Sequence, residues 1–198
     1  GIISLATYFL LREFGLKIYY CFLYSLLFSV LGYTSSGTPF VDHHSTFFCL
    51  LAVYSLLFAI KNEKNIFWIS IPIFLGFAFL SKQVPAFYIF LILSIIIIIY
   101  LFTLNKIDPL KSILLGIILF IFFLILLIFF GGIKFESFIN QYILYPQSIG
   151  NDRFSNFKPT FDGIVSHFKF IYISIAPFFF INLKLIISNK KFFKKKHF

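Results

Sequence analysis

Long apolar runs without a single charged residue recur along this chain, and they constrain its fold more than any other feature. The runs Val84–Leu104 and Ser112–Gly131 each match the thickness of a bilayer's hydrocarbon core, which takes about 20 helical residues. Only 12% of the 198 residues are charged, against about 25% in soluble domains. Backbone groups in hydrocarbon need internal hydrogen bonds, and the sequence lacks the alternating pattern of a membrane β-barrel. We therefore predict an all-α, polytopic bundle of transmembrane helices.

Seven spans are predicted from these runs, and the first of them is partial. The connections alternate between strongly basic segments, such as the one with Lys61 and Lys64, and segments with few cations. Because basic loops stay in the cytoplasm, this alternation predicts the orientation of every span. The predicted spans are Gly1–Leu11, Ile18–Tyr33, His44–Ile60, Ile66–Ser81, Val84–Leu104, Ser112–Gly131 and Val165–Ile187.

This topology predicts one transmembrane domain, residues 1–189, with an outer segment at 132–163 and a basic cytoplasmic tail at 190–198. The net charge of +10 comes from lysines at span ends and not from one basic face, so nucleic acid is not an expected partner. Cys21 and Cys49 lie inside apolar runs and are expected to be small buried side chains. The chain has no methionine, so we expect it to be a piece of a longer protein.

Scarce polar residues gather in the stretch Gly37–Phe48, GTPFVDHHSTFF, which this topology places on the outer face. Asp42 is one of seven carboxylates in the chain, and it is followed directly by His43 and His44. Ionisable groups at a membrane boundary are costly, so they indicate a functional site. A structural alternative makes Asp42 the cap of a helix that begins at His43. A divalent metal ion held by Asp42 and one histidine is a further alternative, although adjacent side chains on a helix diverge by about 100°.

Two of the cations in the predicted outer segments are candidate site residues. Lys82, followed by Gln83, sits in a very short turn between two spans, where it either binds a phosphate group or extends to the surface from a helix end. Arg153 is either a phosphate-binding guanidinium or a solvated partner of Asp152. Before it, Phe135–Leu144 is predicted to form an amphipathic helix on the membrane surface.

Three stretches together resemble a class of membrane enzymes. They are VDHHSTFFCLLAVYSLLFAIK at 41–61, IPIFLGFAFLSKQVPAFYIF at 71–90, and the broken outer segment after the next span. They are similar to GT-C type glycosyltransferases, which use a polyprenyl-phosphate-linked sugar, and within these to the protein mannosyltransferase and aminoarabinose transferase branch. The resemblance covers about residues 20 to 160. The acidic residues most associated with catalysis in that class lie in the first outer loop, upstream of this chain.

The resemblance implies a GT-C-like bundle that transfers a sugar to a glycan, lipid or protein acceptor on the outer face of a bacterial inner membrane. It implies that Lys82 and Arg153 stabilise the leaving phosphate. Asp42, at a position where the class often has an acidic residue, would orient or deprotonate the acceptor. His43, His44 and Gln83 are expected to bind substrate beside them. The alternative function is a secondary transporter or flippase for a polar lipid or anion, but the span centres lack the charges typical of that class.

Overall fold

The computed structural model describes residues 1–32, 41–104 and 107–149, together with separate residues between 160 and 180. The chain divides into two compact units, Gly1–Tyr142 and Ile143–Phe198. The described residues form helices and turns and contain no strand, so the predicted all-α class is confirmed. Three of the helices are long and apolar enough to cross a membrane. The protein is therefore an all-α integral membrane protein.

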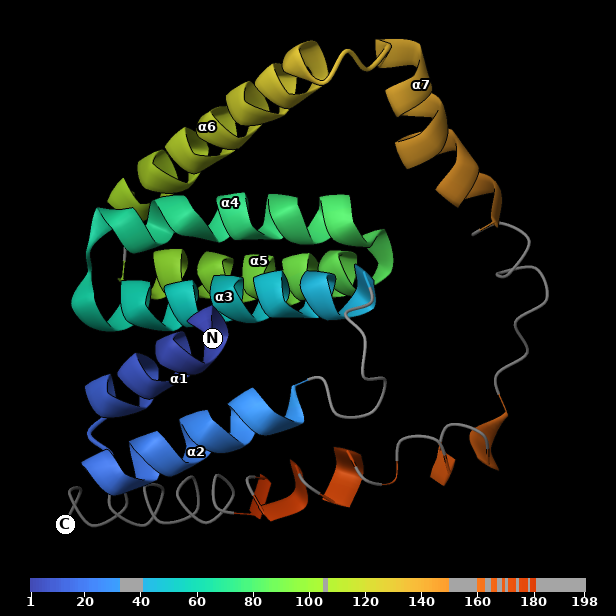
Figure 1. Cartoon of the computed structure of the whole chain (residues 1–198). Helices are drawn as coiled ribbons and strands as arrows, with labels where there is room; N and C mark the ends of the chain where they lie inside the picture. The colour runs from blue at the N-terminus through green and yellow to red at the C-terminus, as the bar shows by residue number, and fades with distance from the viewer. Residues whose placement is uncertain are drawn as a thin grey trace, which may run out of the picture. The chain divides into compact units, whose positions relative to one another are not determined.

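Helices occupy the first six of the predicted runs (Figure 1). The three that have the length of a membrane span are α3, α5 and α6, whereas α2 and α4 are shorter apolar helices. The seventh predicted span, Val165–Ile187, and the boundary at 189 fall largely outside the described residues and stay predictions. The helix bounds are α1 (Ile2–Glu13), α2 (Ile18–Leu31), α3 (Val41–Asn62), α4 (Asn65–Ser81), α5 (Gln83–Leu104) and α6 (Asp108–Phe130).

A left-handed glycine ends α6 and redirects the chain. Gly132 has a φ of 63°, a conformation that a glycine adopts without the steric cost of a Cβ atom. The chain then forms α7 (Phe135–Ile139) and a π-helical turn, Asn140–Leu144. The segment Phe135–Leu144, which is predicted to be a helix, is thus an α-helix in its first half and a wider π-helical turn in its second half. Phe138 stacks on Tyr142 with ring centroids 5.0 Å apart, as expected for neighbours on one helix face.

Helix α3 is the centre of the first unit and contacts α1, α4 and α5 (Figure 1). Its buried face carries mostly small residues at alternating spacings of four and three residues. All of them are at most 5% exposed: Ser45, Cys49, Ala52, Leu56 and Ala59. Small residues allow two helix backbones to approach closely in a membrane, and this spacing is that of a left-handed helix pair. The prediction that Cys21 and Cys49 are buried is confirmed.

Helices α4 and α6 meet at two glycines. A Cβ atom at Gly116 would lie 2.3 Å from the backbone oxygen of Ile69, and one at Gly76 would lie 2.4 Å from the ring of Phe120. Real Cβ atoms essentially never come within 3.0 Å of another heavy atom. The two helices are therefore as close as glycine alone permits. The ring of Phe77 extends this contact with an edge-to-face packing on Phe120, at a centroid distance of 5.8 Å.

The two ends of the helical bundle differ in charge. At one end α1 joins α2, α3 joins α4, and α5 joins α6, and we call it the basic end. Its described cations are Arg12, Lys17, Lys61, Lys64 and Lys111. There the ammonium of Lys61 lies 4.9 Å from the ring centroid of Phe14, which links two of these connections. We call the opposite end the Asp42 end. That the basic end faces the cytoplasm stays a prediction.

Replacing Gly116 by alanine should destabilise the bundle by about 1–3 kcal/mol, because a methyl group there overlaps a backbone oxygen of α4 that cannot rotate away. Thermal unfolding of the purified chain in detergent measures this effect. The control is Ile118→Phe, which enlarges an exposed side chain of the same helix. Equal melting temperatures for the two variants would contradict the close approach of α4 and α6.

Candidate functional site

A single residue, Lys82, joins α4 to α5. Helix α4 ends at Ser81 and α5 begins at Gln83, so the predicted very short turn is confirmed. Lys82 adopts an extended conformation, with φ −159° and ψ 127°, and its backbone N–H still donates to the carbonyl of Ala78 at 2.9 Å. The junction is therefore tied to the last turn of α4.

The fully buried hydroxyl of Ser45 fixes the start of α3 against this junction. Its Oγ donates toward the carbonyl oxygens of Ala78 and Lys82, each at 3.0 Å. The last carbonyls of a helix lack partners within the helix, and leaving them buried and unpaired is costly. The carbonyl of Ala78 already accepts from the N–H of Lys82, and Ser45 adds a donor from another helix to this carbonyl and to that of Lys82. No sequence motif marks Ser45, although its spacing from Cys49 and Ala52 places it on the small-residue face of α3.

This contact brings Asp42 and Lys82 together. The Nζ atom of Lys82 forms an ion pair with Oδ1 of Asp42, and the two side chains are 43% and 53% exposed, respectively. Because α3 begins at Val41, Asp42 lies inside its first turn, and the interpretation of Asp42 as a helix cap is wrong. A carboxylate in the first turn is favoured by the helix dipole. Two of the predicted site residues, distant in sequence, thus form one accessible pair of opposite charges.

The two histidines lie in different surroundings, as adjacent residues on a helix must. His43 is partly buried, packs against the ring of Phe47 at a centroid distance of 6.5 Å, and lines an apolar groove of about 560 Å³. The walls of this groove come from α2, α3 and α5, with Phe28, Val53 and Ile89 among them. His44 is exposed. The charge pair and the apolar groove are therefore linked through neighbouring residues of one helix turn.

Gln83 connects the junction to the third predicted outer segment. Its Nε2 donates a hydrogen bond to the backbone carbonyl of Tyr142, in the π-helical turn that follows α7. Residues from all three predicted outer segments thus meet at the Asp42 end. Arg153 lies outside the described residues, so its place relative to Lys82 stays a prediction.

A metal ion held by Asp42 and one histidine would have no third histidine, cysteine, aspartate or glutamate ligand within the described residues. Within residues 1–32, 41–104 and 107–149 and the separate residues after them, no group of three or more histidine, cysteine, aspartate or glutamate side chains could hold a metal ion. The carboxylate of Asp42 is instead engaged by Lys82. The side chains themselves offer two kinds of chemistry. The carboxylate of Asp42 can accept a proton, and the ammonium of Lys82 can bind an anion.

Fold and site together define an integral membrane protein with an all-α fold, whose Asp42 end holds an accessible carboxylate–ammonium pair beside an apolar groove. The chain has no significant match to a protein-family model, to a curated protein or to a solved structure. The resemblance to GT-C glycosyltransferases rests on the quoted stretches of sequence alone. Function is accordingly inferred from the chemistry of the site.

Replacing Ser45 by alanine should cost about 0.5–1.5 kcal/mol of stability, because the buried hydroxyl that bonds to the carbonyl oxygens of Ala78 and Lys82 is lost. The matched control is Thr103→Ala, since Thr103 is exposed and its hydroxyl bonds only to the carbonyl of Ile99 in its own helix. Thermal unfolding in detergent should show a clear loss for the first variant and little change for the second. Similar melting temperatures would contradict the role given to Ser45.

Proposed function

We propose that the protein is a GT-C-like glycosyltransferase that moves a sugar from a polyprenyl-phosphate carrier to an acceptor at the Asp42 end. In this proposal the Asp42 end faces away from the cytoplasm of a bacterial inner membrane, and the acceptor is a glycan, a lipid or a protein. The observation that supports it is the adjacency of three features that such a reaction needs. They are the carboxylate of Asp42, the ammonium of Lys82 and the apolar groove lined by His43.

The proposed reaction is a displacement at the anomeric carbon of the sugar. A hydroxyl or amine of the acceptor bonds to that carbon while its proton passes to the carboxylate of Asp42. The bond from the anomeric carbon to the phosphate oxygen breaks, and its electron pair leaves with the lipid phosphate. Lys82 stabilises the charge that develops there. Since Asp42 and Lys82 neutralise each other in the structure, a phosphate that takes Lys82 as its partner would release Asp42 to act as a base.

The apolar groove suits the lipid part of the donor. Its volume of about 560 Å³ lies within the range of small-molecule sites, and its lining is almost entirely hydrocarbon or aromatic, with Phe28, Leu50 and Tyr88 as examples. A polyprenyl chain in this groove would place its phosphate near the first turn of α3. We propose that His43 contacts the phosphate there, and that His44 and Gln83 provide further donors to the phosphate or the sugar. The phosphate-binding role of Arg153, which lies outside the described residues, stays a prediction from the sequence.

The distribution of charge favours transfer over transport. Within helices α1 to α6, every charged residue lies in the first or last turn. Transporters of polar lipids and anions place charged residues near mid-membrane, where the substrate crosses. The helices described here present no such path, so the transporter remains the weaker candidate.

Exchanging the charges of the pair separates a structural role from a catalytic one. Asp42→Lys and Lys82→Asp each place like charges together and should cost about 0.2–1 kcal/mol, because the pair is exposed. The double variant should regain this stability and still lose sugar transfer by about 100-fold or more, since the carboxylate no longer faces the acceptor. Transfer is measured in membranes containing the full-length protein, with radiolabelled hexose or pentose on polyprenyl phosphate as donor.

The matched control is the same exchange at the basic end, where Lys111 and Asp108 form an exposed pair at 3.1 Å. That double variant should transfer sugar at the rate of the parent protein. Full activity of the exchanged Asp42 and Lys82 pair would overturn the proposed roles. Uptake of the labelled donor into proteoliposomes without product would favour the transporter.

A further inference from the structure

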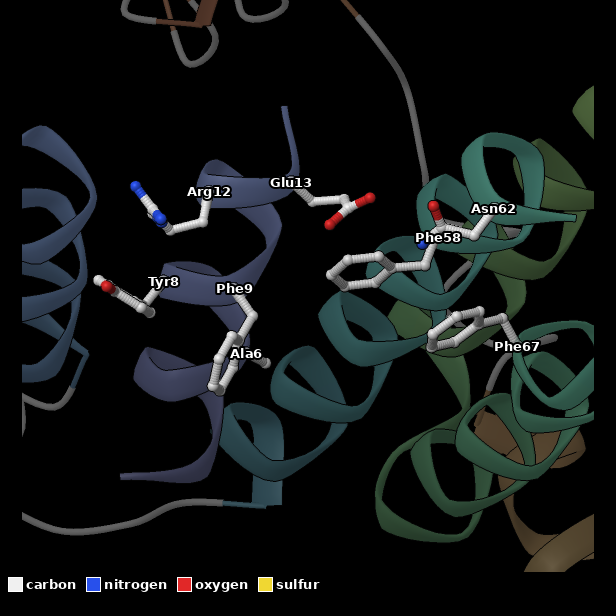
Figure 2. Close-up of a pocket in the computed structure, with 8 residues that line it drawn as sticks. All are labelled: Ala6, Tyr8, Phe9, Arg12, Glu13, Phe58, Asn62 and Phe67. Carbon is white, nitrogen blue, oxygen red and sulfur yellow. The ribbon is translucent and has the colours of Figure 1, made fainter. Parts of the chain in front are cut away.

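Two of the pockets in the described part of the chain lie at the basic end. Figure 2 shows the one lined by α1, α3 and α4, where Arg12 and Glu13 project to opposite sides of the last turn of α1 and do not converge on one group. The other, which we call the Trp68 pocket, is lined by the start of α4, the end of α5 and the start of α6, together with Glu63. Its volume of about 420 Å³ lies within the range of small-molecule sites.

The walls of the Trp68 pocket are held in place by the hydrophobic core. Trp68 belongs to this core, together with Leu56 and Leu93, and is 2% exposed. Its ring lies against that of Tyr100 on α5, at a centroid distance of 5.3 Å. Ile113 of α6 packs against the same core. The side chains of the pocket are therefore fixed by packing before any ligand binds.

The two aromatic rings bring hydrogen-bonding groups to the pocket. In the part of the chain that the structure describes, neither the indole N–H of Trp68 nor the hydroxyl of Tyr100 makes a hydrogen bond. No fully enclosed side-chain nitrogen or oxygen of the described residues lacks a partner, so the indole N–H belongs to the small surface that Trp68 leaves accessible. Trp68 lines the pocket, and its N–H therefore opens there. Because a nearly buried donor is costly to leave unpaired, the pocket favours a ligand that accepts a hydrogen bond.

Two helix starts add further donors. Helix α4 begins at Asn65 and α6 begins at Asp108, and both residues line the pocket. Neither helix start has a hydrogen bond from a capping side chain. The first N–H groups of a helix lack partners within it and form the positive end of its dipole. Both helices therefore favour negative charge at this pocket.

The carboxylates of the lining are already engaged. Asp108 accepts a hydrogen bond from the ammonium of Lys111 at 3.1 Å, and Glu63 also has an interaction partner. The pair of Asp108 and Lys111 is largely exposed, and such pairs are weak, so Lys111 can turn toward another anion. The groups left for a ligand are donors, namely the indole N–H, the tyrosine hydroxyl, the helix N–H groups and the ammonium. This set suits the oxygen atoms of a phosphate group.

The depth of the pocket indicates the source of such a phosphate. Helices α5 and α6 have the length and apolarity of membrane spans, and the pocket lies at the end where they join. The end of a span lies between hydrocarbon and water, in the region of the lipid head groups. We propose that the Trp68 pocket binds the phosphate group of a phospholipid, with Trp68, Tyr100 and Lys111 as donors. The glycosyl transfer is proposed for the Asp42 end, so the two proposals rest on different residues.

The fluorescence of Trp68 tests this proposal, because Trp68 is the only tryptophan of the chain. The chain in a non-ionic detergent is titrated with dihexanoyl phosphatidate, with dihexanoylglycerol, which lacks only the phosphate, and with inorganic phosphate. Phosphatidate should shift the emission of Trp68 in a saturable way. Dihexanoylglycerol and inorganic phosphate should leave it unchanged at the same concentrations.

A pair of tyrosine variants locates the binding. Tyr100→Phe keeps the ring that packs on Trp68 and removes the hydroxyl, so it should weaken phosphatidate binding about two- to tenfold, the effect of one hydrogen bond. The matched control is Tyr19→Phe, which removes the hydroxyl of an exposed tyrosine at the basic end but outside this pocket. It should bind phosphatidate as the parent protein does.

Each alternative result has a definite meaning. Equal shifts with phosphatidate and dihexanoylglycerol, or no shift with any of the three compounds, would overturn the phosphate site. Equal affinity for inorganic phosphate and phosphatidate would support the phosphate site and overturn a phospholipid as its source. Equal affinities of Tyr100→Phe and Tyr19→Phe for phosphatidate would overturn the assignment to this pocket. Gel-filtration profiles that match the parent protein establish that both variants keep their fold.

Discussion

The buried hydroxyl of Ser45 sets the geometry of the Asp42 end. The hydrocarbon core of a membrane holds no water that could bond to the last carbonyl groups of a helix. These groups must therefore accept hydrogen bonds within the protein or lie at the membrane–water interface. At the end of α4 the N–H of Lys82 bonds to the carbonyl of Ala78, and the hydroxyl of Ser45 on α3 adds a donor at 3.0 Å from the carbonyl oxygens of Ala78 and Lys82. The same contact fixes the first turn of α3 beside Lys82. The ion pair with Asp42 and the position of His43 on the groove both follow from it.

The positions of the helices could be predicted from the sequence, because a charge-free apolar run in a membrane has few alternatives to a helix. The pairing of Asp42 with Lys82 could be anticipated in outline, since both are scarce charges in segments expected on one face. Their contact could not be predicted, because it depends on the one-residue junction after Ser81 and on the buried Ser45. The interpretation of Asp42 as a cap was wrong for a local reason, since α3 begins at Val41.

The packing of the helices could not be predicted from the sequence, because the spans are uniformly apolar. In water, the hydrophobic face of a helix identifies what it packs against, but in lipid every face is apolar. The signal lies instead in small residues, such as Ala52 and Ala59 on α3 and Gly116 on α6. At the basic end, Arg12 and Glu13 line a pocket, although no motif in the sequence indicates it.

The ion pairs at the two ends of the bundle differ, because Asp42 and Lys82 are far apart in sequence whereas Asp108 and Lys111 lie within one turn of α6. At the Asp42 end, the carboxylate and the ammonium are paired within the protein, so any ligand of either group would compete with that pairing. Such an exposed pair adds at most about 1 kcal/mol to stability, so its contribution to the fold is small beside the buried contacts of Ser45. The Asp42–Lys82 pair therefore depends on the packing of α3 against the end of α4, and a ligand that separated its charges would act on that junction.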